Sequence, residues 1–211
     1  MTNPGNEAIG GLYAIVDPAG ADDLLGFTAA VVRGGAAVVQ LRDKSKSVGQ
    51  IYERAVAMQA VCRELGAIFI VNDRLDVALA CGADGVHLGP EDLPVKAARA
   101  VVPEGFIIGG SAGTVERARQ LEAGGADYLG VGAVFEARAS KPDASAPRGP
   151  AVITSVVDAV EIPVVGIGGI GLENAAEVID AGAAGVAVIR ALSDADDPQA
   201  AAAALAKRIE N

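Results

Sequence analysis

The stretch FIVNDRLDVALACGADGVHLGPEDLP, residues 69–94, decides the fold because it reads as strand, helix, strand and loop in one run. The first apolar segment ends at Asn72 and Asp73, a helix is predicted over 74–83, and a second apolar strand over 85–88. Continuous apolar strands separated by helices indicate a parallel sheet that is buried on both faces.

Each of these two strands is followed by a carboxylate. In parallel sheets the reacting groups lie just past the carboxyl ends of the strands. We therefore expect Asp73 and Asp92 to point into one mouth, from strands about 5 Å apart if they are neighbours. Two carboxylates suit Mg²⁺ bridged to a substrate phosphate. The alternative is that each aspartate caps the helix that follows it, and the spacing does not decide between the two.

The same alternation continues along the chain, and it predicts eight strands and eight helices. The strands are expected at residues 12–16, 37–42, 68–71, 85–88, 106–112, 128–135, 163–170 and 185–189. The helices are expected at residues 22–35, 47–66, 74–83, 94–102, 114–125, 151–160, 172–183 and 197–210.

An internal repeat supports this count. A Gly-Ala pair precedes a strand at Gly35, Gly82, Gly125 and Gly182, with spacings of 47, 43 and 57 residues, or about two strand–helix units each. Recurrence at this period indicates a barrel built from quarters. The predicted fold is an α/β single-domain (β/α)₈ TIM barrel, and a doubly wound open sheet is the weaker alternative.

Length and composition set further bounds. The 211 residues are expected to form one domain, residues 1–211, with a disordered tail at 1–10. The net charge of −10 argues against nucleic acid or an anionic membrane surface as the main partner. No signal peptide and no apolar run of about 18 residues is found. We expect a cytoplasmic protein without a membrane span, and the sequence allows a homo-oligomer.

Charged residues cluster at the end of the second predicted strand. Gln40, Arg42 and Lys44 alternate along the chain, so they share one face and can reach inward. Arginine offers a planar fork and lysine a point charge, and both suit pyrophosphate oxygens. An ordinary charged loop is the alternative.

Glycines mark the ends of the last two strands, at GIGGI (166–170) and beside AVIR (187–190). Substrate phosphates bind at this place in many barrels, and glycine lets backbone N–H groups approach the oxygens. The alternative is that the glycines serve tight packing alone. A third basic element is the long loop at 136–149 with Lys141, interpreted either as a closing lid or as a solvated loop.

Several classes of chemistry are not supported by the residues available. His87 is the one histidine, and a structural or rim role is favoured over acid–base catalysis. One histidine and two separated cysteines cannot supply a zinc site of the usual kind. The groups that remain at the strand ends are Lys, Arg, Asp and backbone amides. These groups indicate small phosphorylated substrates.

Several segments of the sequence together resemble a known family. QLRDK, the block at 69–94, IIGGSAGT, GADYLGVGAVF, PVVGIGGI and GVAVI occur in order, and together they resemble thiamine phosphate synthase over residues 12 to 205. The central block is the most specific part. The resemblance implies a transferase of thiamine biosynthesis that joins hydroxymethylpyrimidine diphosphate to thiazole phosphate, releases pyrophosphate and uses Mg²⁺.

The resemblance also implies roles for individual residues. Asp73 and Asp92 would hold the metal, and Ser111 and Lys141 would act on the reacting groups, with Ser111 near the pyrimidine. The residues expected around the diphosphate are Gln40, Arg42, Lys44 and Asn72. Those expected at the thiazole phosphate are Gly169, Ile189 and Arg190. The implied chemistry is ionisation of the pyrimidine diphosphate to a resonance-stabilised cation that the thiazole nitrogen traps.

The chain departs from the family pattern in two places. A Thr-x-Thr-Lys run usually follows the sixth strand, whereas here Ala137, Arg138 and Ala139 precede Ser140 and Lys141, so both threonines are absent and the lysine falls one position late. A small residue is usual where this chain has Arg190. Either Arg190 takes over phosphate binding or the second substrate differs.

Three other functions compete with the synthase. A thiazole tautomerase of the same superfamily relies on a histidine after the fifth strand, and this chain has Gly113 there. A paralogue that binds ligand without turnover would retain the metal site and form no product. A sugar-phosphate isomerase or aldolase would need a base or a Schiff-base lysine within a strand, and neither is found.

Overall fold

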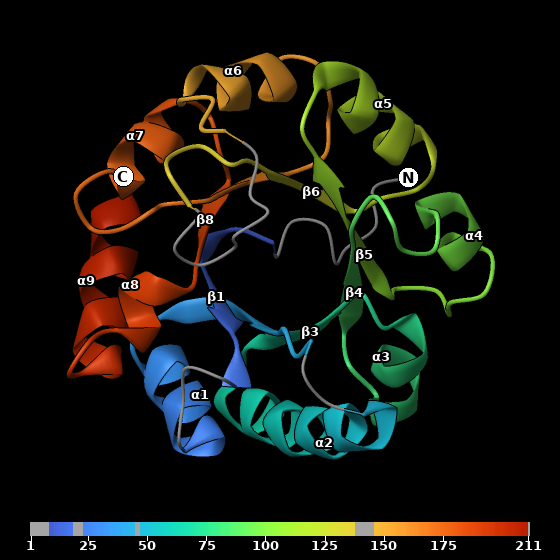
Figure 1. The fold of residues 1–211 in the computed structure, drawn as a ribbon, viewed down its shortest axis with the longest axis vertical. Coiled ribbons are helices and arrows are strands. Elements are labelled where there is room, and N and C mark those ends of the chain that lie inside the picture. The colour runs from blue at the N-terminus through green and yellow to red at the C-terminus, as the bar shows by residue number, and fades with distance from the viewer. Residues whose placement is uncertain (1–8, 19–22, 45–46, 138–145, 211) are drawn as a thin grey trace.

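The computed structural model describes residues 9–18, 23–44, 47–137 and 146–210, which form a ring of strands inside a ring of helices (Figure 1). The strands are β1 (Gly11–Val16), β2 (Ala36–Leu41), β3 (Ile68–Asn72), β4 (Gly85–Leu88), β5 (Ile107–Ala112), β6 (Tyr128–Val131), β7 (Val164–Ile167) and β8 (Gly185–Val188). The helices are α1 (Leu24–Arg33), α2 (Val48–Leu65), α3 (Leu75–Cys81), α4 (Val95–Arg99), α5 (Val115–Ala123), α6 (Ala151–Val157), α7 (Ala175–Asp180), α8 (Arg190–Ser193) and α9 (Pro198–Ile209).

The strands close into a barrel in the order of the sequence. Each strand pairs in parallel with the next, and β1 pairs with β8 to complete the ring. The predicted (β/α)₈ barrel is therefore confirmed, and the doubly wound open sheet is wrong.

Two separate apolar cores follow from the alternation of side chains along each strand. The outer core lies between the strands and the helices, and Phe69, Val71 and Leu129 are among its completely buried members. The inner core fills the barrel with side chains such as Tyr13, Ile70 and Tyr128. Because strands of a closed barrel are covered on both sides, their sequences are almost continuously apolar.

The helix ends obey local capping rules. Ser47 and Gln50 form a reciprocal capping box at the start of α2, and Gly66 ends that helix in the left-handed conformation. Thr114 accepts a hydrogen bond from the backbone of Arg117 at the start of α5. The long helix α2 therefore begins and ends where its sequence predicts.

The quarter repeat is visible in the backbone. Gly35, Gly82, Gly125 and Gly182 all have positive φ, between 68° and 103°, and each lies between a helix and the following strand. In two of these places an aspartate follows. Asp84 accepts a hydrogen bond from the backbone N–H of Phe69 at 2.7 Å, and Asp127 accepts one from that of Ile108 at 2.7 Å. These carboxylates tie the start of one strand to the strand before it.

The expected tail ends earlier than the sequence indicates. Residues 1–8 lie outside the described part of the chain, but Ile9 is described and is 1% exposed. Ile9 belongs to the inner core, so the apolar floor of the barrel extends into the segment that was expected to be disordered.

Several elements are shorter than predicted, and one is new. Strand β6 ends at Val131 instead of residue 135, because its pairing with β5 ends there. The backbone N–H groups of Val134 and Phe135 still donate to the carbonyls of Ile167 and Gly168. The short helix α8 directly follows β8 and was not predicted. Among the described residues, none of the helices has both the length and the hydrophobicity that a membrane crossing would need.

Candidate active site

A cavity of about 690 Å³ opens where the strands end. Its size is in the usual range for small-molecule sites. It is lined by most of the predicted site residues: Gln40, Arg42, Lys44, Asn72, Asp73, Asp92, Ser111, Gly169, Ile189 and Arg190. Lys141, together with Arg138, Ala139 and Ser140 of the altered loop, lies outside the described residues. The carboxyl ends of the strands thus bring together distant parts of the chain, as expected for this fold.

The two predicted metal ligands do not cap helices. Helix α3 begins after Arg74 and α4 after Pro94, and neither N-terminus has a side-chain cap. Asp92 instead accepts a hydrogen bond from the backbone N–H of Gly89 at 2.7 Å. Asp73 has φ of 64°, a left-handed conformation that is uncommon outside glycine and concentrates at functional sites. The capping alternative is therefore wrong.

Asp73 and Asp92 lie next to each other at the mouth, and Asp73 affects the pKa of Asp92. Burial is the main cause that raises the pKa of Asp92; the hydrogen bond from Gly89 partly offsets it, and the adjacent Asp73 carboxyl raises it further. Lys44 Nζ lies 3.5 Å from an Asp73 carboxylate oxygen. A cation would stabilise two carboxylates placed this close together.

The donor set fits a hard divalent cation. Within the described part of the chain, no group of three or more His, Cys, Asp or Glu side chains is placed to hold a metal. Two carboxylates leave most coordination positions to water and phosphate oxygens, which is how Mg²⁺ is usually bound. Asp73 and Asp92 therefore match Mg²⁺ better than a metal that needs a complete protein cage.

The basic side chains at the end of β2 are held by acidic partners. Arg42 Nη1 donates to a carboxylate oxygen of Asp17, just past β1, at 2.9 Å. Asp43 points the other way and pairs with Arg54 of α2 at 2.8 Å. The predicted alternation is thus confirmed: Gln40, Arg42 and Lys44 line the cavity, whereas Asp43 anchors the loop to the helix layer.

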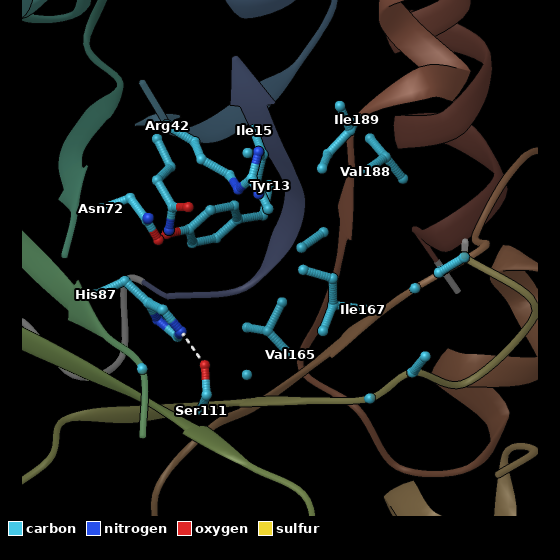
Figure 2. Close-up of a pocket in the computed structure, with 18 of the residues that line it drawn as sticks. Tyr13, Ile15, Arg42, Asn72, His87, Ser111, Val165, Ile167, Val188 and Ile189 are labelled. Atoms are coloured by element: carbon cyan, nitrogen blue, oxygen red, sulfur yellow. Dashed lines mark hydrogen bonds between the residues drawn. The ribbon is translucent and has the colours of Figure 1, made fainter. Parts of the chain in front are cut away.

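The floor of the cavity is polar on one side. His87 on β4 is hydrogen bonded through Nε2 to Ser111 Oγ on β5 at 2.9 Å, which Figure 2 shows as a dashed line. Its Nδ1 lies 3.0 Å from the hydroxyl of Tyr128. Burial lowers the pKa of His87 to about 4, although Asp92 opposes this, so the imidazole is neutral at neutral pH.

The opposite side of the cavity is apolar and built from β7 and β8. In Figure 2, Ile167, Val188 and Ile189 lie across from Arg42, Asn72 and His87, and Val165 lies near Ser111. Gly168 and Gly169 follow β7, with φ of 102° and 65°. A Cβ at Gly169 would lie 2.4 Å from the carbonyl oxygen of Glu136, so tight packing also requires glycine here.

Arg190 begins α8 and lines the cavity, with its guanidinium paired to Asp194 one turn later at 2.7 Å. Its side chain is half exposed. Arg190 thus lines the same cavity as the glycine-rich end of β7.

The described ends of the long loop are held in place. The backbone N–H groups of Arg148 and Gly149 donate to Ala133 and Val134, and the Arg148 guanidinium donates to the carbonyl of Gly113. Ala137 is buried and lines the cavity. The interpretation of the loop as a lid concerns residues outside the described part.

Two tyrosines of the floor were missed by sequence reasoning. Tyr13 and Tyr128 are 2% and 1% exposed, and their hydroxyls lie 2.9 Å apart. A signal was present, because tyrosine is rare in this chain and both lie at inward positions of predicted strands. Arg117, near the start of α5, also lines the cavity and was not singled out.

Comparison with known proteins gives one consistent family. The family model for thiamine monophosphate synthase matches residues 12–192. A thiamine-phosphate synthase of Methanospirillum hungatei is 52% identical over 168 residues, which are 80% of this chain and 81% of that protein. The thiamine biosynthesis bifunctional protein ThiM/ThiE of Symbiobacterium thermophilum is 49% identical over 92% of this chain, and the match spans 40% of that longer protein.

A solved structure gives the same result. The thiamine phosphate pyrophosphorylase from Pyrococcus furiosus superposes with a TM-score of 0.89 and 39% identity, covering 99% of this chain and 98% of that one. The similarity therefore extends over the whole barrel, and it includes the strand ends that form the cavity.

Proposed function

The chain belongs to the thiamine monophosphate synthase family, and from this premise we propose how its residues join hydroxymethylpyrimidine diphosphate to thiazole phosphate. The reaction forms thiamine phosphate and releases pyrophosphate. One observation carries the assignment of residues: a single cavity combines the Asp73–Asp92 pair with basic side chains on one side and the glycine-rich end of β7 on the other.

The pyrimidine diphosphate binds on the side of β2 to β4. Arg42 and Lys44 supply positive charge there, and Asn72, the last residue of β3, supplies an amide. Arg42 is oriented by Asp17, which leaves less side-chain freedom to be lost on binding. Gln40 completes the predicted set, but its amide already donates to Tyr13, so this residue supports the floor as well.

Asp73 and Asp92 would hold Mg²⁺ together with diphosphate oxygens, as their oxygen donors and their adjacent carboxylates suggest. When bound, the ion would neutralise the charge that develops on the departing pyrophosphate. Lys44, 3.5 Å from Asp73, would bring a further positive charge to the same oxygens.

The bond between the pyrimidine methylene carbon and the diphosphate oxygen breaks, and its electron pair leaves with pyrophosphate. The lone pair of the thiazole nitrogen then forms the new C–N bond. This chemistry needs stabilisation of a leaving group and no strong base. The neutral His87 fits it, since an imidazolium would repel the cation. Ser111 binds the pyrimidine from the floor, and Lys141 is proposed to act on the leaving group.

The thiazole phosphate binds on the side of β7 and β8. Gly169 and Ile189 bring backbone to the mouth there, and Arg190 adds a guanidinium beside them. Arg190 then replaces the contacts that the family obtains from the threonines missing at 137–139. Arginine can contact phosphate through two parallel hydrogen bonds, which makes this exchange chemically reasonable.

The length and the charge of the whole chain support a proposal for where the protein acts and on which class of substrate. Residues 1–211 would act as one domain, in the cytoplasm, on small phosphorylated substrates and without nucleic acid, in keeping with the net charge of −10. All proposed ligands come from one chain, so a homo-oligomer would leave the site complete but is not required.

The proposal is tested by giving the purified protein each substrate alone and then both together with Mg²⁺. Thiamine phosphate and pyrophosphate should appear together, and only with both substrates. Binding of one substrate without any product would identify a non-catalytic paralogue. Isomerisation of the thiazole alone would identify a tautomerase, against which Gly113 argues because it lines the cavity where that reaction needs a histidine.

A further inference from the structure

Five side chains form a continuous hydrogen-bonded chain across the floor of the barrel. They come from five different strands and link Gln40 to Tyr13, Tyr13 to Tyr128, Tyr128 to His87, and His87 to Ser111. The four distances, in this order, are 2.7, 2.9, 3.0 and 2.9 Å. Its last member, Ser111, is the residue proposed to contact the pyrimidine.

The hydrogen-bonded chain lies within the packed barrel, and its members are not flexible surface side chains. Gln40, Tyr13 and Tyr128 are each 3% exposed or less. Glycines on the neighbouring strands make the room: a Cβ at Gly109 would lie 2.2 Å from the Tyr128 ring, and one at Gly130 would lie 3.0 Å from His87 Cε1. A side chain at residue 109 would exclude the Tyr128 ring from its position, and one at residue 130 would displace the His87 ring by a few tenths of an ångström.

The number of protons available gives the chain a direction. The Gln40 amide N–H donates to the Tyr13 hydroxyl, and among the described residues Tyr128 is the remaining hydrogen-bond partner of that hydroxyl. Tyr13 therefore donates to Tyr128, because the opposite direction would leave the buried Tyr13 proton without an acceptor. The Tyr128 proton is then left for Nδ1 of His87. A neutral imidazole carries one N–H, which must be on Nε2 and donate to Ser111 Oγ. The Ser111 hydroxyl proton is therefore not used within the chain.

The members of the hydrogen-bonded chain are uncharged. Burial raises the pKa of both Tyr13 and Tyr128 above the usual value, so both hydroxyls keep their protons. The ring nitrogens of His87 are hydrogen bonded to two uncharged hydroxyls, those of Tyr128 and Ser111, which suits a neutral imidazole. The direction then follows from the Gln40 amide at the far end.

We propose that Gln40, Tyr13 and Tyr128 are positioning residues that hold His87 as the Nε2–H tautomer and thereby direct the Ser111 hydroxyl proton into the cavity. The ligand recognised is an aromatic heterocycle that presents an unprotonated ring nitrogen, and this deepens, and rests on, the proposed binding of a pyrimidine. If the chain ran in the opposite direction, Ser111 would donate to His87 and could only accept a hydrogen bond from the ligand.

The direction can be measured without substrate, because His87 is the one histidine of the chain. In untagged protein labelled with ¹⁵N-histidine, NMR should show the proton on Nε2, with Nδ1 resonating as an unprotonated nitrogen that accepts a hydrogen bond. A proton on Nδ1, or an average of both tautomers, would overturn the proposal. This result is independent of whether the proposed reaction takes place.

Tyr128→Phe tests whether the tyrosine sets this state, with Tyr52→Phe on the exposed face of α2 as the matched control. The Nδ1 resonance should move away from its hydrogen-bonded position in Tyr128→Phe and stay unchanged in Tyr52→Phe. An unmoved Nδ1 resonance in folded Tyr128→Phe would show that no bond from Tyr128 reaches His87.

Kinetics then separate positioning from direct contact. Tyr128→Phe should raise the KM for the pyrimidine diphosphate by about 3- to 10-fold, the usual effect of one hydrogen bond, and leave that for the thiazole phosphate unchanged. In a Ser111→Ala background the same change should have no further effect, because Tyr128 acts through Ser111. Independent, multiplicative effects of the two substitutions would contradict this, as would an equal rise in both KM values.

Discussion

In the proposed site, the two sides of the barrel mouth would bind phosphate in different ways. The side formed by β2, β3 and β4 uses charged side chains that hold one another, as Arg42 is held by Asp17 and Lys44 lies near Asp73. The side formed by β7 and β8 uses glycine-rich backbone and a single arginine, Arg190. The first kind of site depends on residue identity, and the second depends mainly on the path of the backbone.

This difference explains where the chain departs from its family. The departures at 137–141 and at Arg190 concern the residues that we propose for the thiazole phosphate and the pyrophosphate, and they leave the proposed metal ligands unchanged. A binding site made of backbone N–H groups tolerates changes in the side chains around it, whereas a pair of adjacent carboxylates does not. The comparison predicts that substitutions on the two sides have different sizes and different signatures.

The largest effect is expected from Asp73→Ala, which should lower kcat by about 100- to 1,000-fold because a main electrostatic contact to the leaving group is lost. Asp76→Ala, on the exposed surface of α3 and paired with Arg74, is the matched control and should retain activity. Steady-state kinetics and a thermal unfolding curve measure both. Near-normal turnover in Asp73→Ala would remove the metal assignment from this residue.

The next largest effect is expected from Gly169→Ala, because an L side chain at φ of 65° is strained and its Cβ would collide with the carbonyl of Glu136. Displacement of this backbone should raise the KM for the thiazole phosphate by up to about 100-fold and affect the pyrimidine diphosphate less. Gly171→Ala is the control, since a Cβ there meets nothing within 4 Å. An equal rise in both KM values would indicate that Gly169 serves packing alone.

A smaller effect, about 10-fold on the same KM, is expected from Arg190→Ala, because one charge-assisted contact to phosphate is lost. Asp194→Ala serves as the control: it breaks the same ion pair but leaves the guanidinium in place. If the two variants behave alike, the ion pair within α8 matters and the phosphate contact does not. The exposed pair itself should contribute little to stability.

A separate effect concerns stability and the floor of the cavity. The pKa of His87 is about 4 in the fold, whereas an unfolded histidine titrates near its model value of 6.5. Between these values the unfolded state binds more protons, so stability is full above about pH 6.5 and falls as the pH decreases towards 4. The loss should not exceed about 3 kcal/mol. Denaturant unfolding across this range should show a slope that His87→Gln lacks; equal slopes would contradict the buried neutral state.

The barrel was predictable because its signals are local. The apolar runs of the strands, the ends of the helix expected at 47–66 and the Gly-Ala pairs are each signals within a few residues, and the structure confirms them. Helix α8 was not predicted, because four residues after a strand have no helical periodicity to read. Strand β6 was predicted too long, because GVGAVF remains apolar after its pairing with β5 has ended.

The site was predictable in part for the same reason. Residues at strand ends, such as Arg42 and Asp73, follow from where each strand stops, whereas Ser111 was expected only from the family resemblance. The hydrogen-bonded chain through Tyr13 and Tyr128 could not be predicted, because it depends on how β1 and β6 are placed relative to each other, and these strands are not adjacent in the barrel. The vacated space at Gly109 and Gly130 likewise becomes meaningful only once the partner rings are known.

The central claim is that the Asp73–Asp92 pair holds Mg²⁺ and that pyrophosphate departs against this charge. The most direct test is product formation by the wild-type protein after treatment with a chelator and after Mg²⁺ is restored. The account predicts no product without the metal, and thiamine phosphate and pyrophosphate in equal amounts once it returns. Undiminished formation of both products with the chelator present would contradict it.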